Sequence, residues 1–187
     1  MRCALLLSVL LPLLLGGCGE KSSPDGSKSA DENPTAPSED VKPKLKHEIK
    51  GDEVTITDCN EAATGELIIP ETIEGNPVTS IGVQAFYRCA SLTSITLPDG
   101  VTSIGEAAFF RCSSLTSITI PDGVTSIEES AFGGCDHLTA VSFLGDAPKV
   151  GEQVFQESSP TIYRKADAKG WGDTFAGRPV KLITEKP

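Results

Sequence analysis

Three consecutive segments decide the fold: VTSIGVQAFYRCASLTSITLPDG (78–100), VTSIGEAAFFRCSSLTSITIPDG (101–123) and VTSIEESAFGGCDHLTAVSFLGD (124–146). They repeat every 23 residues with fixed apolar columns, which is typical of leucine-rich solenoids. One repeat alone cannot bury these side chains, whereas stacked coils align each column into a continuous core. We therefore predict a leucine-rich-repeat solenoid. The expected core columns are Val78, Val101 and Val124; Ile81, Ile104, Ile127 and Val150; Phe86, Phe109, Phe132 and Phe155; and Leu92, Leu115 and Leu138.

Each repeat predicts its own local structure. The stretch LTSITLP alternates apolar and hydroxyl residues, which favours a strand with one buried face. Stacking these strands gives a parallel sheet, and Pro98 and Pro121 followed by Asp-Gly end them in turns. We expect V-T-S-I to form a second short strand and the Ala-Phe stretch to form a single helical turn.

The pattern predicts atypical ends, because terminal repeats must cap an open core. We expect a leucine-rich-repeat domain at 47–187, with an N-terminal cap at 47–77, repeats at 78–155 and a C-terminal cap at 156–187. Residues 66–70 match an earlier strand, with five extra residues looped out around 74–77. The C-terminal cap is expected to be closed by Trp171, Phe175, Val180 and Leu182.

The N-terminus predicts export. Arg2 precedes an apolar run at 4–15 that is too short to span a bilayer, so residues 1–17 are interpreted as a signal peptide. The run ends in Leu-Gly-Gly-Cys, which resembles the lipobox of bacterial lipoproteins and implies lipidation of Cys18. The alternative is an ordinary signal peptide with a chance cysteine. Residues 18–46 are rich in Ser, Pro and charged residues, and we interpret them as a lipid-anchored, disordered tether.

Charge and cysteine usage limit the partners. The net charge is −10, which argues against nucleic acid and against electrostatic docking on anionic lipid, so the membrane contact is expected to be the lipid on Cys18. Without a Cys-x-x-Cys pair and with two histidines, the chain predicts no zinc site, no other metal and no cofactor. Cys89, Cys112 and Cys135 share one repeat position, where buried free thiols are favoured over disulfides. We expect Cys59, in the N-terminal cap, to be buried as well.

The repeats resemble the BspA-type leucine-rich repeats of bacterial surface proteins over about residues 50–165. The matching unit is Pro98, Val101, Ile104-Gly105, Ala108-Phe109, Cys112 and Ser114-Leu115 with Ile118. The resemblance implies binding at the cell surface, to host or matrix proteins or to neighbouring cells. It does not imply an enzyme.

Two surfaces are candidates for binding. The unburied face of the long-strand sheet carries Ser94, Thr96, Ser117, Thr119, Ala140 and Ser142, which we call the hydroxyl face. Solenoids often bind through such a face, but Ser and Thr on neighbouring strands also simply stabilise a sheet.

The second candidate is the aromatic–arginine patch, formed by Tyr87, Arg88, Phe110 and Arg111. These residues should stack in register, and aromatics with arginine are typical of interface centres. The alternative is that the rings shield the core edge while the arginines neutralise a column of acidic residues, Glu106, Glu129 and Glu152.

Nothing in the sequence predicts catalysis. His137 follows Cys135-Asp136, but no third residue is placed to orient a base, and no hydrolase or phosphate-binding motif occurs. The sequence thus predicts a non-enzymatic envelope lipoprotein that binds a protein or a glycan, adhesion included. The alternative is a periplasm-facing scaffold. The residue after the lipid cysteine is Gly19 rather than Asp, which by resemblance to known lipoprotein sorting rules favours the outer membrane or cell surface.

Overall fold

The computed structural model describes residues 45–185. The predicted signal peptide, the lipidation site Cys18 and all of the predicted tether except Leu45 and Lys46 lie outside the described residues. Those two residues begin the first strand, so the folded domain starts slightly earlier than residue 47.

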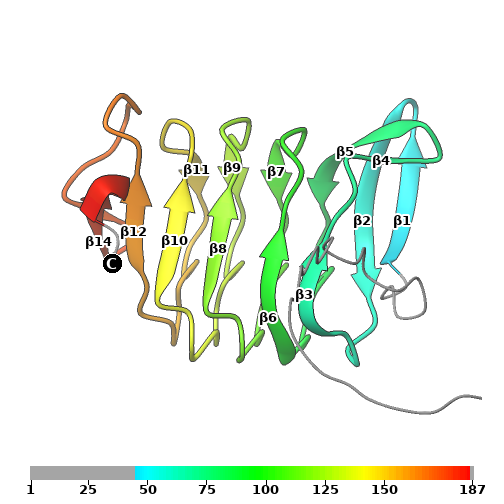
Figure 1. Cartoon of the computed structure of the whole chain (residues 1–187), viewed down its shortest axis with the longest axis horizontal. Helices are drawn as coiled ribbons and strands as arrows, with labels where there is room; N and C mark the ends of the chain where they lie inside the picture. Colours follow the sequence, from blue (N-terminus) through cyan, green and yellow to red (C-terminus); the bar gives the residue numbers. More distant parts are fainter. Residues whose placement is uncertain (1–44, 186–187) are drawn as a thin grey trace, which may run out of the picture. The chain divides into compact units, whose positions relative to one another are not determined.

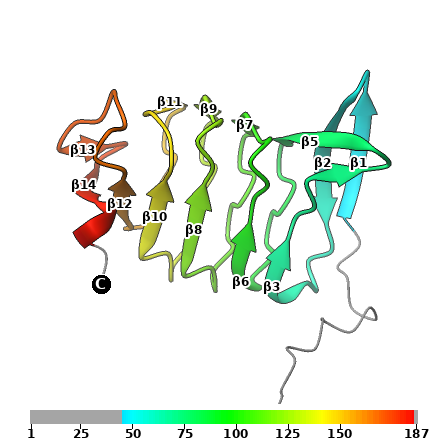
Figure 2. The same cartoon turned by 45° about the horizontal axis from the view of Figure 1, so that its top comes forward.

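Two rows of strands form the walls of a solenoid (Figures 1 and 2). The first sheet contains, in spatial order, β1 (Leu45–Lys50), β2 (Glu53–Cys59), β5 (Asn76–Ile81), β7 (Ser103–Ile104), β9 (Ser126–Ile127) and β11 (Lys149–Val150), with β4 (Thr72–Ile73) paired to β5. Its strands are parallel from β2 to β11, and β1 is antiparallel to β2. The V-T-S-I segments thus form the short second strands that we predicted.

The second sheet holds the longer strands of the repeat. Its order is β3 (Thr64–Ile68), β6 (Ser91–Thr96), β8 (Ser117–Ile120), β10 (Ala140–Phe143), β12 (Thr161–Arg164), β14 (Arg178–Leu182) and β13 (Thr174–Phe175). All neighbours are parallel except β13 and β14. Strand β3 confirms the early strand at residues 66–70, and the extra residues after it form the β4–β5 hairpin.

The repeated apolar columns fill the space between the sheets. Phe86, Phe109 and Phe132 are completely buried, and their rings stack on one another and on Phe155 with centroids 5.1 to 5.7 Å apart. The valine and leucine columns are buried as predicted. Val150 differs, because β11 is the edge strand of the first sheet and leaves this side chain 36% exposed.

The Ala-Phe segments form consecutive tight turns rather than the expected helical turn. The amides of Ala85, Tyr87 and Cys89 bond to carbonyls three residues earlier, while Gln84 and Arg88 have φ angles of 56° and 59°. A helix requires negative φ at every residue, so it cannot form here. In the described part of the chain, helix is confined to the 3₁₀ segment η2 (Ile183–Glu185).

The turns also join neighbouring coils, in what we call the turn ladder. In each of the first three turns, three amides donate to carbonyls of the following coil. For the first turn the donors are Gln84, Phe86 and Arg88, and the acceptors are Glu106, Ala108 and Phe110, at 2.8 to 2.9 Å. The turns therefore propagate the stack in the same direction as the strands.

The cysteine column lies beside the phenylalanines. Cys59, Cys89, Cys112 and Cys135 are all buried and free, which confirms the prediction of buried thiols. Cys112 Sγ donates to the carbonyl oxygen of Phe86 and Cys135 Sγ to that of Phe109, each at 3.1 Å. The thiol thus supplies a hydrogen bond to a buried carbonyl that would otherwise lack an inter-coil donor.

The C-terminal cap closes the core with an aromatic cluster. Trp171 lies 4.9 Å from Phe143 and 4.8 Å from Phe175, centroid to centroid, and its Nε1 donates to the carbonyl oxygen of Gly145. Trp171, Phe175 and Val180 pack against the core as expected. Over residues 45–185, no helix has the length and apolar character needed to cross a membrane.

Candidate functional site

The aromatic–arginine patch forms the stack that the sequence predicts. The rings of Tyr87 and Phe110 are nearly parallel, with centroids 5.8 Å apart. The Arg88 guanidinium lies 5.3 Å from the Tyr87 ring centroid, and that of Arg111 lies 5.6 Å from the Phe110 centroid. Both rings are half-buried and both arginines are exposed. Each cation therefore contacts an aromatic ring while its charge stays available to a ligand.

The backbone of the turns creates this arrangement. Arg88 and Arg111 have φ angles of 59° and 61°, which turn each arginine back over the ring that precedes it. The next coil has Gly133 and Gly134 at the corresponding positions. A Cβ atom on Gly133 would lie 2.8 Å from two ring atoms of Phe110. Gly133 therefore allows the Phe110 ring to pack against the next turn. The patch ends there, because Gly133 and Gly134 stand in place of the aromatic residue and the arginine.

A groove of about 600 Å³ runs beside the patch. Both arginines line it, together with three carboxylates: Glu61, Asp136 and Glu157. The groove therefore offers cations, hydrogen-bond acceptors and adjacent aromatic edges. Such a surface suits a polar ligand that carries both donors and anionic groups.

The arginines do not neutralise the acidic column. Among residues 45–185, the ion pairs within 4.0 Å are Lys46–Asp58, His47–Glu74 and Lys50–Glu48. The contacts expected under the purely structural interpretation, from Arg88 and Arg111 to Glu106, Glu129 and Glu152, do not form. Both guanidiniums are thus free to pair with a ligand.

The hydroxyl face is the unburied side of the second sheet, and the register confirms its rows. Ser94 pairs with Ser117, and Thr96 with Thr119. These side chains line a smaller groove of about 270 Å³, which Leu144 also lines. Their hydroxyls have no hydrogen bond within the described part of the chain.

Other threonines make the inter-coil bonds instead. Thr102 Oγ1 donates to the carbonyl of Thr79, and Thr125 Oγ1 to that of Thr102. The hydroxyl face is shorter than we expected, because Ser142 is 5% exposed and Ala140 is 9% exposed. Its accessible part is therefore confined to strands β6 and β8.

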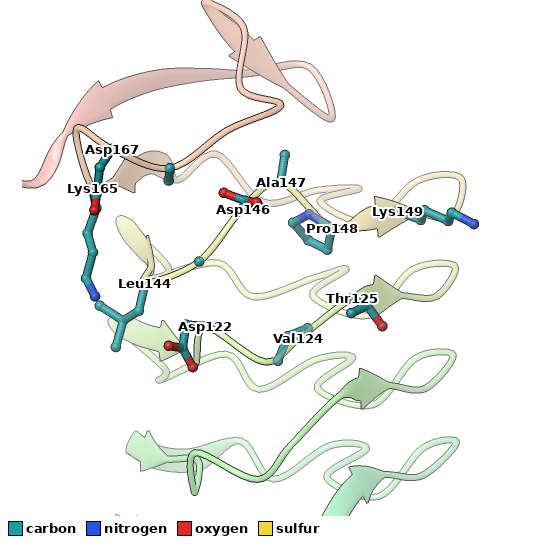
Figure 3. A pocket seen from close by; sticks show the side chains of 12 residues that line it. Asp122, Val124, Thr125, Leu144, Asp146, Ala147, Pro148, Lys149, Lys165 and Asp167 are labelled. Atoms are coloured by element: carbon teal, nitrogen blue, oxygen red, sulfur yellow. The ribbon is translucent and has the colours of Figure 1, made fainter.

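A third concavity, which the sequence did not indicate, lies where strands β8, β10 and β12 end (Figure 3). It measures about 610 Å³, and its charged lining residues are Asp122, Asp146, Asp167, Lys149 and Lys165. Asp146 Oδ1 accepts a hydrogen bond from the Lys169 amide at 2.6 Å. Only Asp122 belongs to a repeated Pro-Asp-Gly turn, so the sequence contains no signal that these carboxylates lie together.

The described residues contain no cluster of three or more His, Cys, Asp and Glu side chains suited to a metal ion. His137 is exposed, and its Nδ1 lies 2.7 Å from the carbonyl oxygen of Ser113. That contact is to backbone, so His137 belongs to the inter-coil hydrogen bonding.

Comparisons with known proteins agree with this architecture. The family model for the BspA type leucine rich repeat region matches residues 64–164 with six copies. A leucine-rich repeat protein from Bacteroides capillosus is 31% identical, with a TM-score of 0.57 over 67% of this chain and 96% of that one. One from Bacteroides ovatus is 27% identical, with a TM-score of 0.57 over 78% of this chain and 37% of that one.

A third similar structure is the leucine-rich repeat protein of T. pallidum. It is 25% identical, with a TM-score of 0.54 over 64% of this chain and 68% of that chain. A comparison with curated proteins found no match.

Proposed function

This chain belongs to the BspA type leucine-rich repeat family, and from that premise we propose that it is a non-enzymatic binding module displayed at the cell surface. Membership of this family is consistent with a binding or scaffold role. The proposal adds that the solenoid contacts a protein or a glycan outside the cell, adhesion to other cells included.

The aromatic–arginine patch is the observation that carries this proposal. Tyr87 and Phe110 are stacked, half-buried rings, and each bears an arginine with no carboxylate partner. Such residues dominate binding energy when a partner covers them. A protein partner can pair an acidic side chain with the arginines. A glycan can contact the edges of the aromatic rings while its hydroxyls donate hydrogen bonds to Glu61, Asp136 and Glu157.

We place the module on a membrane through lipid on Cys18. The lipobox-like sequence before Cys18 supports this anchor, and the polar stretch after it has the composition of a flexible spacer. A multiply acylated cysteine holds a protein on a bilayer far better than a single chain does. The outer membrane, with the domain facing outward, is the location that suits a binding role best.

A binding screen tests the assignment to the patch. The full chain is applied to arrays of extracellular matrix proteins and of glycans, beside the double variant Arg88→Gln/Arg111→Gln. A matched control, Lys149→Gln/Lys165→Gln, removes the same two charges from the pocket in Figure 3.

We expect at least one ligand that the full chain and the control bind alike and that the patch variant binds roughly tenfold more weakly or worse. If both variants bind every ligand as the full chain does, the patch is not the site.

A further inference from the structure

The turn ladder stops at the last repeat and leaves hydrogen-bond donors behind. In the two middle turns every ladder amide has a carbonyl in the next coil; Phe109, for example, donates to Ala131, and Phe132 to Val154, at 2.8 and 2.9 Å. One step further along, the equivalent amides belong to Gln153, Phe155 and Glu157. These three have no acceptor among the described residues.

The direction of these amides follows from the ladder. Each paired amide points at the following coil, so the amides of Gln153 and Phe155 point off the end of the stack. Gln153 and Glu157 have φ angles of 55° and 56° on either side of Phe155. The paired turns have positive φ angles at the same positions, so the amides of Gln153 and Phe155 keep their ladder orientation and present two free donors to an anion.

A pocket of about 300 Å³ lies over this end of the ladder. Gln153 and Phe155 line one side, and Ala176 and Arg178 line the other. Arg178 stands at the start of β14, and its Nη2 donates to the carbonyl oxygen of Phe155 at 2.8 Å. Its Nε is buried and has no hydrogen-bond partner. Unpaired buried donors are rare, so this nitrogen requires a partner, which a water, an ion or a ligand group could supply.

We propose that this pocket binds a carboxylate group. The pocket offers hydrogen-bond donors only, from two backbone amides and Arg178 Nε. A carboxylate offers acceptors only, and its two oxygens lie in a plane that suits a guanidinium. The chain carries a net charge of −10, so a singly charged carboxylate is repelled less than a doubly charged phosphate. This site lies on the end of the solenoid and does not depend on the aromatic–arginine patch.

The test is an amide-resolved titration of the ¹⁵N-labelled full chain in detergent, with sodium acetate added at constant ionic strength. The molecule contains its own control, because Ser130 and Phe132 occupy the same ladder positions one coil earlier but are paired. We expect saturable shifts of the Gln153 and Phe155 amide signals and unchanged Ser130 and Phe132 signals.

Two further probes identify the source of the carboxylate. N-acetylglycine represents a peptide C-terminus, with N-acetylglycinamide as its uncharged partner, and glucuronate represents an acidic sugar. Tighter saturation by either acid than by acetate assigns that source, and equal saturation by all three assigns a small organic acid. N-acetylglycinamide, which has no carboxylate, should leave the Gln153 and Phe155 signals unchanged.

Arg178→Gln removes the side-chain donor, and Arg164→Gln is the matched control, because this arginine lies outside the pocket and bonds to the carbonyls of Lys165 and Ala166. We expect the first variant to bind acetate roughly tenfold more weakly, as for loss of one charge-assisted hydrogen bond, and the second to bind normally. If no carboxylate shifts the Gln153 and Phe155 signals of the unaltered chain, or if Ser130 and Phe132 shift equally, the proposal is wrong.

Discussion

Ser158 Oγ donates a hydrogen bond to the carbonyl oxygen of Phe132 over 2.7 Å, at the position where the preceding coils have a cysteine. The thiols of Cys112 and Cys135 donate to the carbonyls of Phe86 and Phe109 in the same way. The repeat position therefore requires a small side chain with a donor hydrogen. Neither a disulfide nor a metal is needed to explain the cysteine column.

The first prediction follows from this equivalence. Cys112→Ala leaves the Phe86 carbonyl without its inter-coil donor, whereas Cys112→Ser keeps one, as Ser158 does. We expect the alanine variant to be the less stable of the two by about 1 kcal/mol, the usual net value of one hydrogen bond. Urea unfolding of both variants, followed by Trp171 fluorescence, measures the difference. Equal or reversed stabilities would show that the thiol acts only by filling space.

The second prediction concerns pH. Burial raises the pKa of the Cys135 thiol to about 12, and it also raises the pKa of the Cys112 thiol. Thiols of the unfolded chain ionise near pH 8.5, so above that pH the unfolded state loses protons that the folded state keeps. The stabilising contribution is complete below about pH 8.5 and is lost as the pH rises toward 12.

Unfolding in urea at pH 7.5 and 10.5 checks this effect. We expect the free energy of unfolding to fall by about 2 kcal/mol more in the unaltered chain than in Cys135→Ser, which has no thiol at this position. The comparison cancels the titration of lysines and tyrosines that both proteins share. Identical pH dependence in the two proteins would contradict a thiol pKa that is raised by folding.

The third prediction compares two neighbouring rings. Phe109 is completely buried between Phe86 and Phe132, whereas Phe110 is half-buried in the patch. We expect Phe109→Ala to reduce the free energy of unfolding by about 3–5 kcal/mol, and Phe110→Ala to reduce it by much less. Chemical denaturation measures both changes. A similar loss in the two variants would mean that Phe110 is a core residue and not part of a binding surface.

The fourth prediction uses the glycine beneath the patch. Gly133→Ala would place a Cβ atom 2.8 Å from the Phe110 ring, which must then move away from residue 133 and change its stacking on Tyr87. We expect a loss of about 1–2 kcal/mol in stability and an altered near-UV circular dichroism signal, because the ring stack is disturbed. The control is Gly172→Ala, whose Cβ meets only ordinary contacts at 3.6 Å or more. Equal effects in both variants would contradict the role assigned to Gly133.

The core was predictable from the sequence because identical apolar residues recur at every 23rd position, and only stacking buries them all. The free thiols and the Tyr87–Phe110 stack followed from the same periodicity. The turn conformation was not predictable in this way. Gln84 and Arg88 are not typical left-handed residues, and their positive φ angles belong to the tight turns, in which amides bond to carbonyls three residues earlier.

Features at the ends of the stack were the least predictable, because they depend on where periodicity fails. Val150 keeps the repeat register but lies in an edge strand, so it is exposed. The pocket beside Arg178 exists because the turn that contains Phe155 is the last one of the turn ladder. The repeated columns of the sequence give no sign of this pocket. The break at Ser158 marks this end in the sequence, but the unpaired amides are visible only in three dimensions.

The central claim, that the solenoid is displayed outside the cell for binding, is tested most directly by protease treatment of intact cells. Cells carrying the full chain are treated with protease and blotted for residues 47–187, with the purified chain digested in parallel to show that it can be cleaved. We predict that the domain disappears from unlysed cells. If it survives until the envelope is broken, while the purified chain is cleaved under the same conditions, the domain faces inward and the claim is wrong.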